Sequence, residues 1–349
     1  MRTRIYYPFI LLIALLTTVS CENELPFSVK DNPPKLVMNA LITADSLTNV
    51  LYLNFTGRGY ATHAEKATVE VRVNGQLSES LRPLPPQAEG DMQCRFNISG
   101  KFSPGDVVRI DALTDDGQYH AWAEVTVPQR PNEITDIDTV TVPLTQYYYT
   151  QNYLRYKINI KDRPNENNFY RLIMDKQMTV KDYNNEIGEY VTQTTHRYHF
   201  ISREDVVLTD GQPTNSDDED NGMFDTVKNI YGVFDDSRFK NTSYTMTVYN
   251  QTNVEGLSKY GTNVKMDIIV RLLSITETEY YYLKALNLAD SDAYDETINE
   301  PIKYPGNVHG GVGIVGISTE TSKIIHIEKP WIWKLVTFNL YSSHYRYSV

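Results

Sequence analysis

Hydrophobic positions along most of this chain recur at every second residue, which is the spacing of a strand with one buried face. Over 68–73 this alternation places Val69, Val71 and Val73 on one face, and Asn74-Gly75 follows as a hairpin signal. Similar strand patterns lie at 35–43, 49–56, 92–98, 106–113 and 119–127. Short strands separated by turn residues predict an immunoglobulin-like or transthyretin-like β-sandwich over 35–128.

A prolyl segment at 128–131 ends this first series, because proline cannot donate to a sheet and stiffens a linker. Further strand patterns lie at 153–160, 170–179, 189–200, 243–249 and 265–274. Ser274 with Glu277 three residues later resembles a capping box and predicts a helix over 277–288, with apolar residues on all sides. We therefore expect a larger β-rich second domain over 132–349, sandwich or barrel-like, with one packed helix.

The first residues have the pattern of a secretory signal. Arg2 and Arg4 precede an uncharged apolar run at 9–19, and small residues follow. The run is too short to span a bilayer, which needs ~20 apolar residues. We expect residues 1–20 to be removed as a signal peptide.

A cysteine stands directly after Val19-Ser20, as in a bacterial lipobox, although the usual leucine three positions earlier is Thr18. An ordinary signal peptide with a chance cysteine is the alternative. The lipobox predicts that Cys21 carries acyl chains such as palmitate, since two or more chains anchor a protein stably where one does not. Residues 21–34 are polar and contain three prolines, which predicts a tether.

Length and charge narrow the classes of function. Removing 20 residues from 349 leaves 329, which is long for one core and favours two domains. A formal net charge of −11 argues against nucleic acid as a partner, because phosphate binding needs a basic face. Lipidation of Cys21 leaves Cys94 without an intramolecular partner, so we expect Cys94 to be a small buried hydrophobe.

Gly311, Gly313 and Gly316 satisfy the spacing of a dinucleotide-binding loop, but that site requires a strand before the glycines and a helix after them. Here the downstream residues at 317–329 have a strand pattern. We therefore expect a loop that enters a strand, with glycines that permit close backbone packing.

Two patterns resemble metal sites. The acidic run 217–222 starts like a calcium loop, but its twelfth position is Lys228 instead of glutamate. A solvated acidic loop is favoured, and weak calcium binding by Asp217, Asp220 and Asp225 stays open. His196 and His199 are three residues apart in a predicted strand, so they point to opposite faces and do not predict a shared metal. We expect no metal, no cofactor and no catalytic residues, because no spacing marks a nucleophile or an acid/base pair.

Several segments in order carry a family resemblance. These are 34–39 (PKLVMN), 104–105 (PG), 125–128 (VTVP), 233–239 (VFDDSRF), 243–246 (SYTM), 274–281 (SITETEYY), 299–302 (NEPI) and 307–316 (NVHGGVGIVG). Over about 21–318 the chain resembles the Bacteroidota outer-membrane lipoprotein family known as domain of unknown function 4249. The resemblance implies a place beside TonB-dependent transporters and no assigned catalytic residues. The segment 329–349 lies outside it.

Together these observations predict a non-enzymatic lipoprotein, held in the outer membrane by its lipid anchor and exposed at the cell surface. We expect it to be an accessory binding component of a TonB-dependent uptake system. The alternative is a lipidated adhesin or a structural subunit of the cell surface. Because the tether places the first domain nearest the membrane, we expect the second domain to present the partner surface.

Particular residues are candidates for contacts and modification. The chain has 26 tyrosines, and exposed tyrosines favour interfaces, although the same residues also fill β-rich cores. The candidate partner surface consists of Tyr147, Tyr148, Tyr149, Asp217, Asp218 and Asp220. Three Asp-Ser/Thr-aliphatic patterns resemble the O-glycosylation sequon of Bacteroidota secreted proteins. They would place glycans on Ser46, Thr139 and Thr226.

Overall fold

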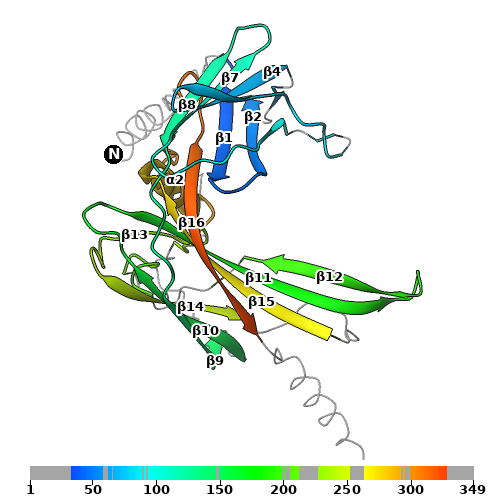
Figure 1. The fold of residues 1–349 in the computed structure, drawn as a ribbon, viewed down its shortest axis with the longest axis vertical. Coiled ribbons are helices and arrows are strands. Elements are labelled where there is room, and N and C mark those ends of the chain that lie inside the picture. Colours follow the sequence, from blue (N-terminus) through cyan, green and yellow to red (C-terminus); the bar gives the residue numbers. More distant parts are fainter. Residues whose placement is uncertain are drawn as a thin grey trace, which may run out of the picture. The chain divides into compact units, whose positions relative to one another are not determined.

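The computed structural model describes residues 33–57, 62–64, 66–88, 90–91, 93–146, 149–198, 200, 205–211, 227–251, 263–291, 294 and 299–327. Strands account for 54% of these described residues and helix for 5%, in several sheets with a single helix (Figure 1). This confirms the prediction of a mostly β protein with one packed helix. The described residues from Lys35 onward belong to one compact unit.

The first part of the chain forms a β-sandwich-like core. Its strands are β1 (Leu36–Thr43), β2 (Asn49–Phe55), β3 (Thr62–His63), β4 (Ala67–Val73), β5 (Gln76–Leu81), β6 (Arg95–Ile98), β7 (Val107–Thr114) and β8 (His120–Thr126). One sheet has the order β5-β4-β7-β8, while β1, β2, β3 and β6 lie in another. Alternate residues such as Met38, Leu53, Val69 and Ile110 are fully buried in the first core. Burial of these alternating apolar side chains is what holds the two sheets together.

The hairpin between β4 and β5 follows from its turn residues. Asn74 and Gly75 have φ of 51° and 82°, the left-handed values that a two-residue hairpin turn requires. The sequence predicted the turn but not β5 itself. Strand β5 is mostly exposed, so it lacks the alternation that identifies a half-buried strand.

The second part of the chain has longer strands. They are β9 (Asp136–Gln146), β10 (Tyr149–Lys161), β11 (Phe169–Asn184), β12 (Glu189–Arg197), β13 (Val233–Asp235), β14 (Ser243–Gln251), β15 (Asn263–Ile275) and β16 (Val315–Ile327). A three-stranded sheet, β14-β10-β9, lies apart from a nine-stranded one that includes β12-β11-β15-β16. Ile158 and Met246 of the first sheet share a core with Leu172 and Ile268 of the second. This core between two sheets favours the sandwich alternative for the second part.

Strand β16 contributes to both cores. Val315 to Ser318 pair in parallel with Ala40 to Thr43 of β1. From Thr319 onward β16 pairs antiparallel with β15. Val315 and Ile317 are therefore buried in the first core, although the sequence assigned them to the second domain. The two-domain division itself stays a prediction.

The helix α2 (Glu277–Ala289) begins two residues after the end of β15. Its N-cap is Thr276, which has an extended backbone. The Thr276 Oγ1 accepts a hydrogen bond from the N–H of Glu279 at 3.2 Å. The sequence placed the cap at Ser274, which was wrong because Ser274 is a buried residue of β15. Residue 276 was the better candidate, since it also has a glutamate three positions later.

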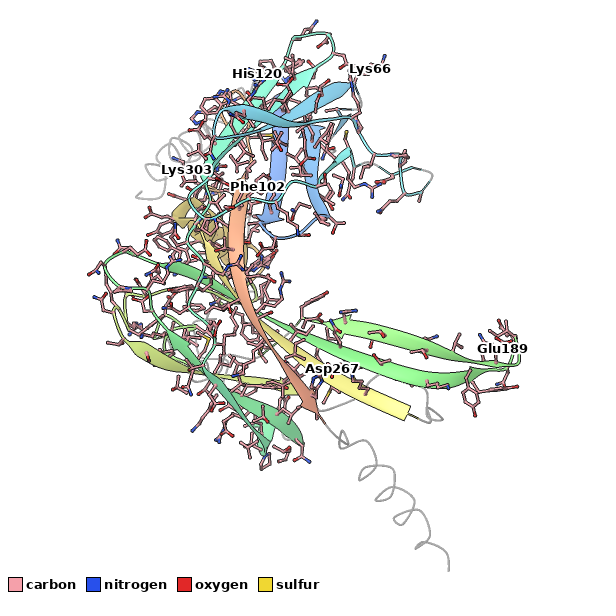
Figure 2. All side chains as sticks on the ribbon, viewed as in Figure 1. Lys66, Phe102, His120, Glu189, Asp267 and Lys303 are labelled. Carbon is pink, nitrogen blue, oxygen red and sulfur yellow. The ribbon has the colours of Figure 1, made fainter. Side chains whose placement is uncertain are left out.

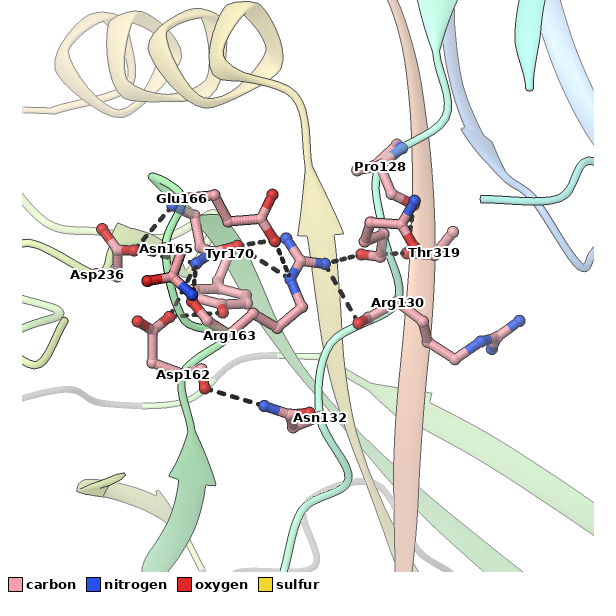
Figure 3. A network of polar contacts seen from close by, with 12 residues as sticks. Pro128, Arg130, Asn132, Asp162, Arg163, Asn165, Glu166, Tyr170, Asp236 and Thr319 are labelled. Carbon is pink, nitrogen blue, oxygen red and sulfur yellow. Dashed lines mark hydrogen bonds and ion pairs between the residues drawn. The ribbon is translucent and has the colours of Figure 1, made fainter. Parts of the chain in front are cut away.

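A polar network fixes the prolyl segment after β8 (Figure 3). The hydroxyl of Thr319 donates to the carbonyls of Pro128 and Gln129 at 3.3 and 3.2 Å. On the other side Arg163 donates to the carbonyls of Gln129 and Arg130. These contacts hold the prolyl segment against β16 and the 161–168 loop.

The loop at 161–168 is itself held by buried polar side chains. The amide of Asn168 donates to the carboxylates of Asp162 and Asp236 at 3.0 and 3.1 Å. The hydroxyl of Tyr170 also donates to Asp162, at 3.0 Å. Mutual hydrogen bonding makes the burial of these two carboxylates tolerable.

Candidate functional site

The glycine-containing segment 308–316 forms backbone hydrogen bonds with strands of the first core. Met38 N–H donates to the carbonyl of Val312 at 2.9 Å, and Val312 N–H donates to Leu36 at 2.8 Å. His309 exchanges a pair of backbone hydrogen bonds with Trp122 of β8. The segment therefore joins β1 to β8 through main-chain contacts.

The glycines are required for this approach. Gly310 has φ of 72°, and a Cβ there would overlap the carbonyl oxygen of His120. Gly313 has φ of 121°, and its Cβ would overlap the carbonyl of Met38. The prediction that these glycines permit close backbone packing is confirmed. Backbone N–H groups of the segment donate within the protein, including that of Val315 to Asn307 at 2.9 Å.

A buried carboxyl group lies against Gly316. Glu279 of α2 is almost completely inaccessible, and its Oε2 has no hydrogen-bond partner among the described residues. Burial raises the pKa of Glu279 to about 7, although the Arg171 guanidinium opposes the rise. Burial also lowers the pKa of Arg171, whose Nε donates to the carbonyl of Tyr231 at 3.0 Å.

A groove of about 510 Å³ lies beside β1, β2, β15 and β16. It is lined by Leu41, Thr43, Asp45, Ser46, Thr48, Asn49, Val50, Arg271 and Glu320. Leu41 also lies beside Gly316, which connects the groove wall with the position of Glu279. The lining offers hydroxyl, carboxylate and guanidinium groups to a polar ligand.

Most charged groups of the groove are already paired. Arg271 Nε donates to Glu320 at 2.9 Å. Arg130 donates to Asp45 at 2.7 Å. The Asn49 amide donates to the Ser46 carbonyl at 3.1 Å and so fixes the turn between β1 and β2. A ligand of the groove would have to compete with these contacts, so the groove is a weaker candidate for function than an open surface.

Strand β12 forms a hairpin with β11 (Figure 1) and is mostly exposed. Every residue of β12 is exposed except Val191, which is half-buried. Near the turn, Tyr183 and Tyr190 are 47% and 54% exposed, and their ring centroids are 5.2 Å apart. Ile187 is 58% exposed in the turn itself. Figure 2 shows Glu189 at this far end of the hairpin.

The sequence predicted strands at 170–179 and 189–200 but not the exposure of β12. The signal lies in β12 itself, where EYVTQTTHR carries one aliphatic residue and no apolar alternation. The sequence also missed the groove and Glu279. The threonine three positions before Glu279 indicates that this glutamate lies in the first turn of the helix, but it does not indicate that the carboxyl group is buried.

Some of the predicted site residues lie in the described part of the structure, and others lie outside it. Ser46 is half-buried in the turn after β1, and Thr139 is half-buried in β9. Cys94 is buried and its thiol donates to the carbonyl of Ala64 at 3.4 Å, which confirms its expected burial. The residues outside the described part are Cys21, Tyr147, Tyr148, His199, Asp217, Asp218, Asp220, Asp225 and Thr226, together with the side chain of Tyr149.

His196 pairs with a carboxylate of the neighbouring strand. Its Nδ1 lies 3.1 Å from Asp175. Within the described ranges, no three histidine, cysteine or acidic residues are arranged to hold a metal ion. No helix in the same ranges combines the length and apolar character that crossing a bilayer requires.

Comparison with known proteins identifies a family. No curated protein shows significant similarity to the chain. A family model matches residues 22–324, which include both cores, α2 and the β11–β12 hairpin. The match covers most of the 349 residues, so the chain belongs to the family described as Domain of unknown function (DUF4249).

Proposed function

We propose that this protein is a non-enzymatic lipoprotein of the Bacteroidota outer membrane, anchored through Cys21 and exposed at the cell surface. In this proposal it binds a partner as an accessory component of a TonB-dependent uptake system. The lipobox-like sequence at 18–21 supports the anchor. The observation that supports binding is the β11–β12 hairpin, with its exposed strand and aromatic end.

The hairpin has the properties of a contact element. Tyr183 and Tyr190 present aromatic rings to solvent, and Lys181 Nζ lies 5.4 Å from the ring centroid of Tyr190. Exposed tyrosines contribute large contact areas at low entropic cost, and they are enriched among residues that dominate binding energy. A binding role explains these exposed rings better than a packing role does.

The alternative function is a lipidated adhesin or a structural subunit of the cell surface. Among the described strands β12 lies at the end of its sheet, which favours this alternative because an edge strand can pair with another chain. Affinity capture from native membranes separates the two. An uptake component is expected to retain a transporter, whereas a structural subunit is expected to retain other copies of itself or matrix proteins.

Replacing Cys21 with alanine should move the protein from the membrane fraction to the soluble fraction. The acyl chains on Cys21 would supply the membrane affinity, at ~0.8 kcal/mol for each buried CH₂ group. Fractionation of native cells with labelled palmitate measures both properties. The Cys94→Ala protein is the control and should stay membrane-bound, because Cys94 is buried in the first core. If the Cys21→Ala protein still carries label, the anchor is elsewhere.

A further inference from the structure

The helix α2 packs on a small apolar cluster of its own. Tyr280 and Leu283 of the helix are buried there with Val233, Leu273 and Ile275. This cluster is separate from the two larger cores. A helix of 13 residues depends on such packing for its stability. Elements held by few buried apolar side chains open locally at a lower free energy than the rest of a protein.

The buried face of α2 also carries the carboxyl group of Glu279, which is 2% exposed. A Cβ at Gly316 would overlap this carboxyl group, so the group occupies the space over the bare glycine backbone of β16. Leu41 of β1 lies beside the same position. The Oε2 atom has no hydrogen-bond partner in the described part of the chain. Ionisation of Glu279 therefore creates a buried charge with no donor at that oxygen.

The charged groups around α2 do not compensate the ionised form. Arg171 of β11 attracts the carboxylate of Glu279, but the effect of burial is larger. The Nε of Arg171 donates to the carbonyl of Tyr231 at 3.0 Å. Charged side chains on the helix and on the neighbouring elements have partners of their own, in the pairs Tyr280–Asp235, Lys284–Asp210, Tyr231–Asp290 and Arg271–Glu320.

From this arrangement we propose that α2 is a pH-controlled lid. The helix stays docked on β11, β13 and β16 while Glu279 holds its proton, and it detaches when the carboxyl group ionises. Detachment leaves the two larger cores closed, because no residue of α2 belongs to either of them. It exposes the apolar side chains that the helix covers, which are Val233, Leu273 and Ile275.

The pH range follows from the proton that only the docked helix retains. The pKa of Glu279 is about 7 when the helix is docked, and it returns to the ordinary 4.5 on detachment. Detachment should therefore become easier as the pH rises from 4.5 to about 7, and should change little above that. Each pKa unit changes an equilibrium tenfold, so the full effect on detachment is roughly 300-fold.

Amide hydrogen exchange of the full-length protein at pH 8 tests whether the helix opens alone. We expect the amides of α2 to be at least about a hundredfold less protected than those of β15, because α2 opens while the cores stay closed. Protection is corrected for the intrinsic pH dependence of exchange. Equal protection of α2 and β15 would overturn the proposal, because the helix would then open only when the whole protein unfolds.

Two glutamine variants test whether Glu279 controls the opening. Glu279→Gln should raise the protection of α2 roughly 300-fold at pH 8 and less than about tenfold at pH 5. Glu277→Gln, which alters an exposed carboxylate in the same helical turn, should change it less than about threefold. The unaltered protein should lose α2 protection roughly 70-fold between pH 5 and pH 8. Constant protection between these pH values, or equal effects of the two variants, would contradict the proposal.

Discussion

Replacing Gly310 with alanine is expected to lower the free energy of unfolding by about 3 kcal/mol, although Gly310 is exposed to solvent. Two effects contribute. The left-handed backbone at φ of 72° costs an alanine about 1 kcal/mol. The added Cβ would also overlap the carbonyl oxygen of His120, and that oxygen belongs to a strand that cannot move independently. The Tm should fall by about 6–12 °C.

Gly117→Ala is the matched control for this prediction. Gly117 has φ of 69°, nearly the same backbone conformation, but nothing lies within 4 Å of the Cβ position. Its replacement should therefore cost only the conformational term of about 1 kcal/mol. Equal losses for the two variants in chemical or thermal unfolding would show that the approach of 308–316 to β8 contributes nothing to stability.

Replacing Glu279 with glutamine is expected to stabilise the protein at pH 8 by roughly 3 kcal/mol and to change little at pH 5. The pKa of Glu279 rises from an ordinary value of 4.5 to about 7 in the folded protein, because burial disfavours the carboxylate. Each pKa unit corresponds to about 1.4 kcal/mol. Glutamine has nearly the same shape and carries no charge at either pH.

The direction of this pH dependence follows from the number of protons that the folded and unfolded chains bind. Between pH 4.5 and about 7 the folded protein holds a proton on Glu279 that the unfolded chain has lost, so stability falls as the pH rises through this window. Above pH 7 the whole decrease in the free energy of unfolding is present. The Glu279→Gln protein does not show this decrease, because glutamine does not titrate. Urea unfolding of both proteins at several pH values between 4.5 and 8 measures the difference.

Glu277→Gln is the control for the helix terminus. Glu277 also lies in the first turn of α2, but it is exposed. Its removal takes a similar carboxylate away from the helix dipole without removing a buried charge. A pH dependence shared by both variants would assign the effect to the helix terminus and contradict the burial of charge at Glu279.

Local patterns in the sequence were sufficient to predict many of the elements. Alternation at 68–73 predicted β4, and Asn74-Gly75 predicted the turn that follows it. The helix predicted over 277–288 lies at 277–289. The glycines at 310–316 were correctly interpreted as sites of close backbone packing, because a strand pattern follows them. In each case the signal lies within a few residues of the element.

Long-range features were not predictable from those patterns. Strand β16 pairs with residues of β1 that are 275 positions away in the chain and with residues of β15 that are 45 to 61 positions away. The burial of Glu279 depends on its contact with Gly316 of β16, and a helix pattern alone does not contain that information. Among the described residues no other element covers β12. Its exposure therefore depends on the rest of the fold, and the sequence of β12 alone indicates that exposure only weakly.

The position of β16 also determines how the partner surface can be tested. A chain that ends near Pro131 would lack Val315 to Ser318, which pair with β1 inside the first core. Such a truncation would disturb the part that it is meant to preserve. Substitutions at the exposed end of the β11–β12 hairpin leave both cores intact, since neither Tyr183 nor Tyr190 is buried.

Affinity capture from native outer membranes tests the binding role most directly. Full-length protein is compared with a Tyr183→Ser/Tyr190→Ser variant and with Tyr304→Ser. Tyr304 is 46% exposed outside the hairpin and serves as the matched control. If the hairpin binds the uptake partner, a transporter should be retained by the unaltered and Tyr304→Ser proteins and reduced at least about tenfold in the double variant. Equal retention of every partner by all three folded proteins would contradict a binding role for the hairpin.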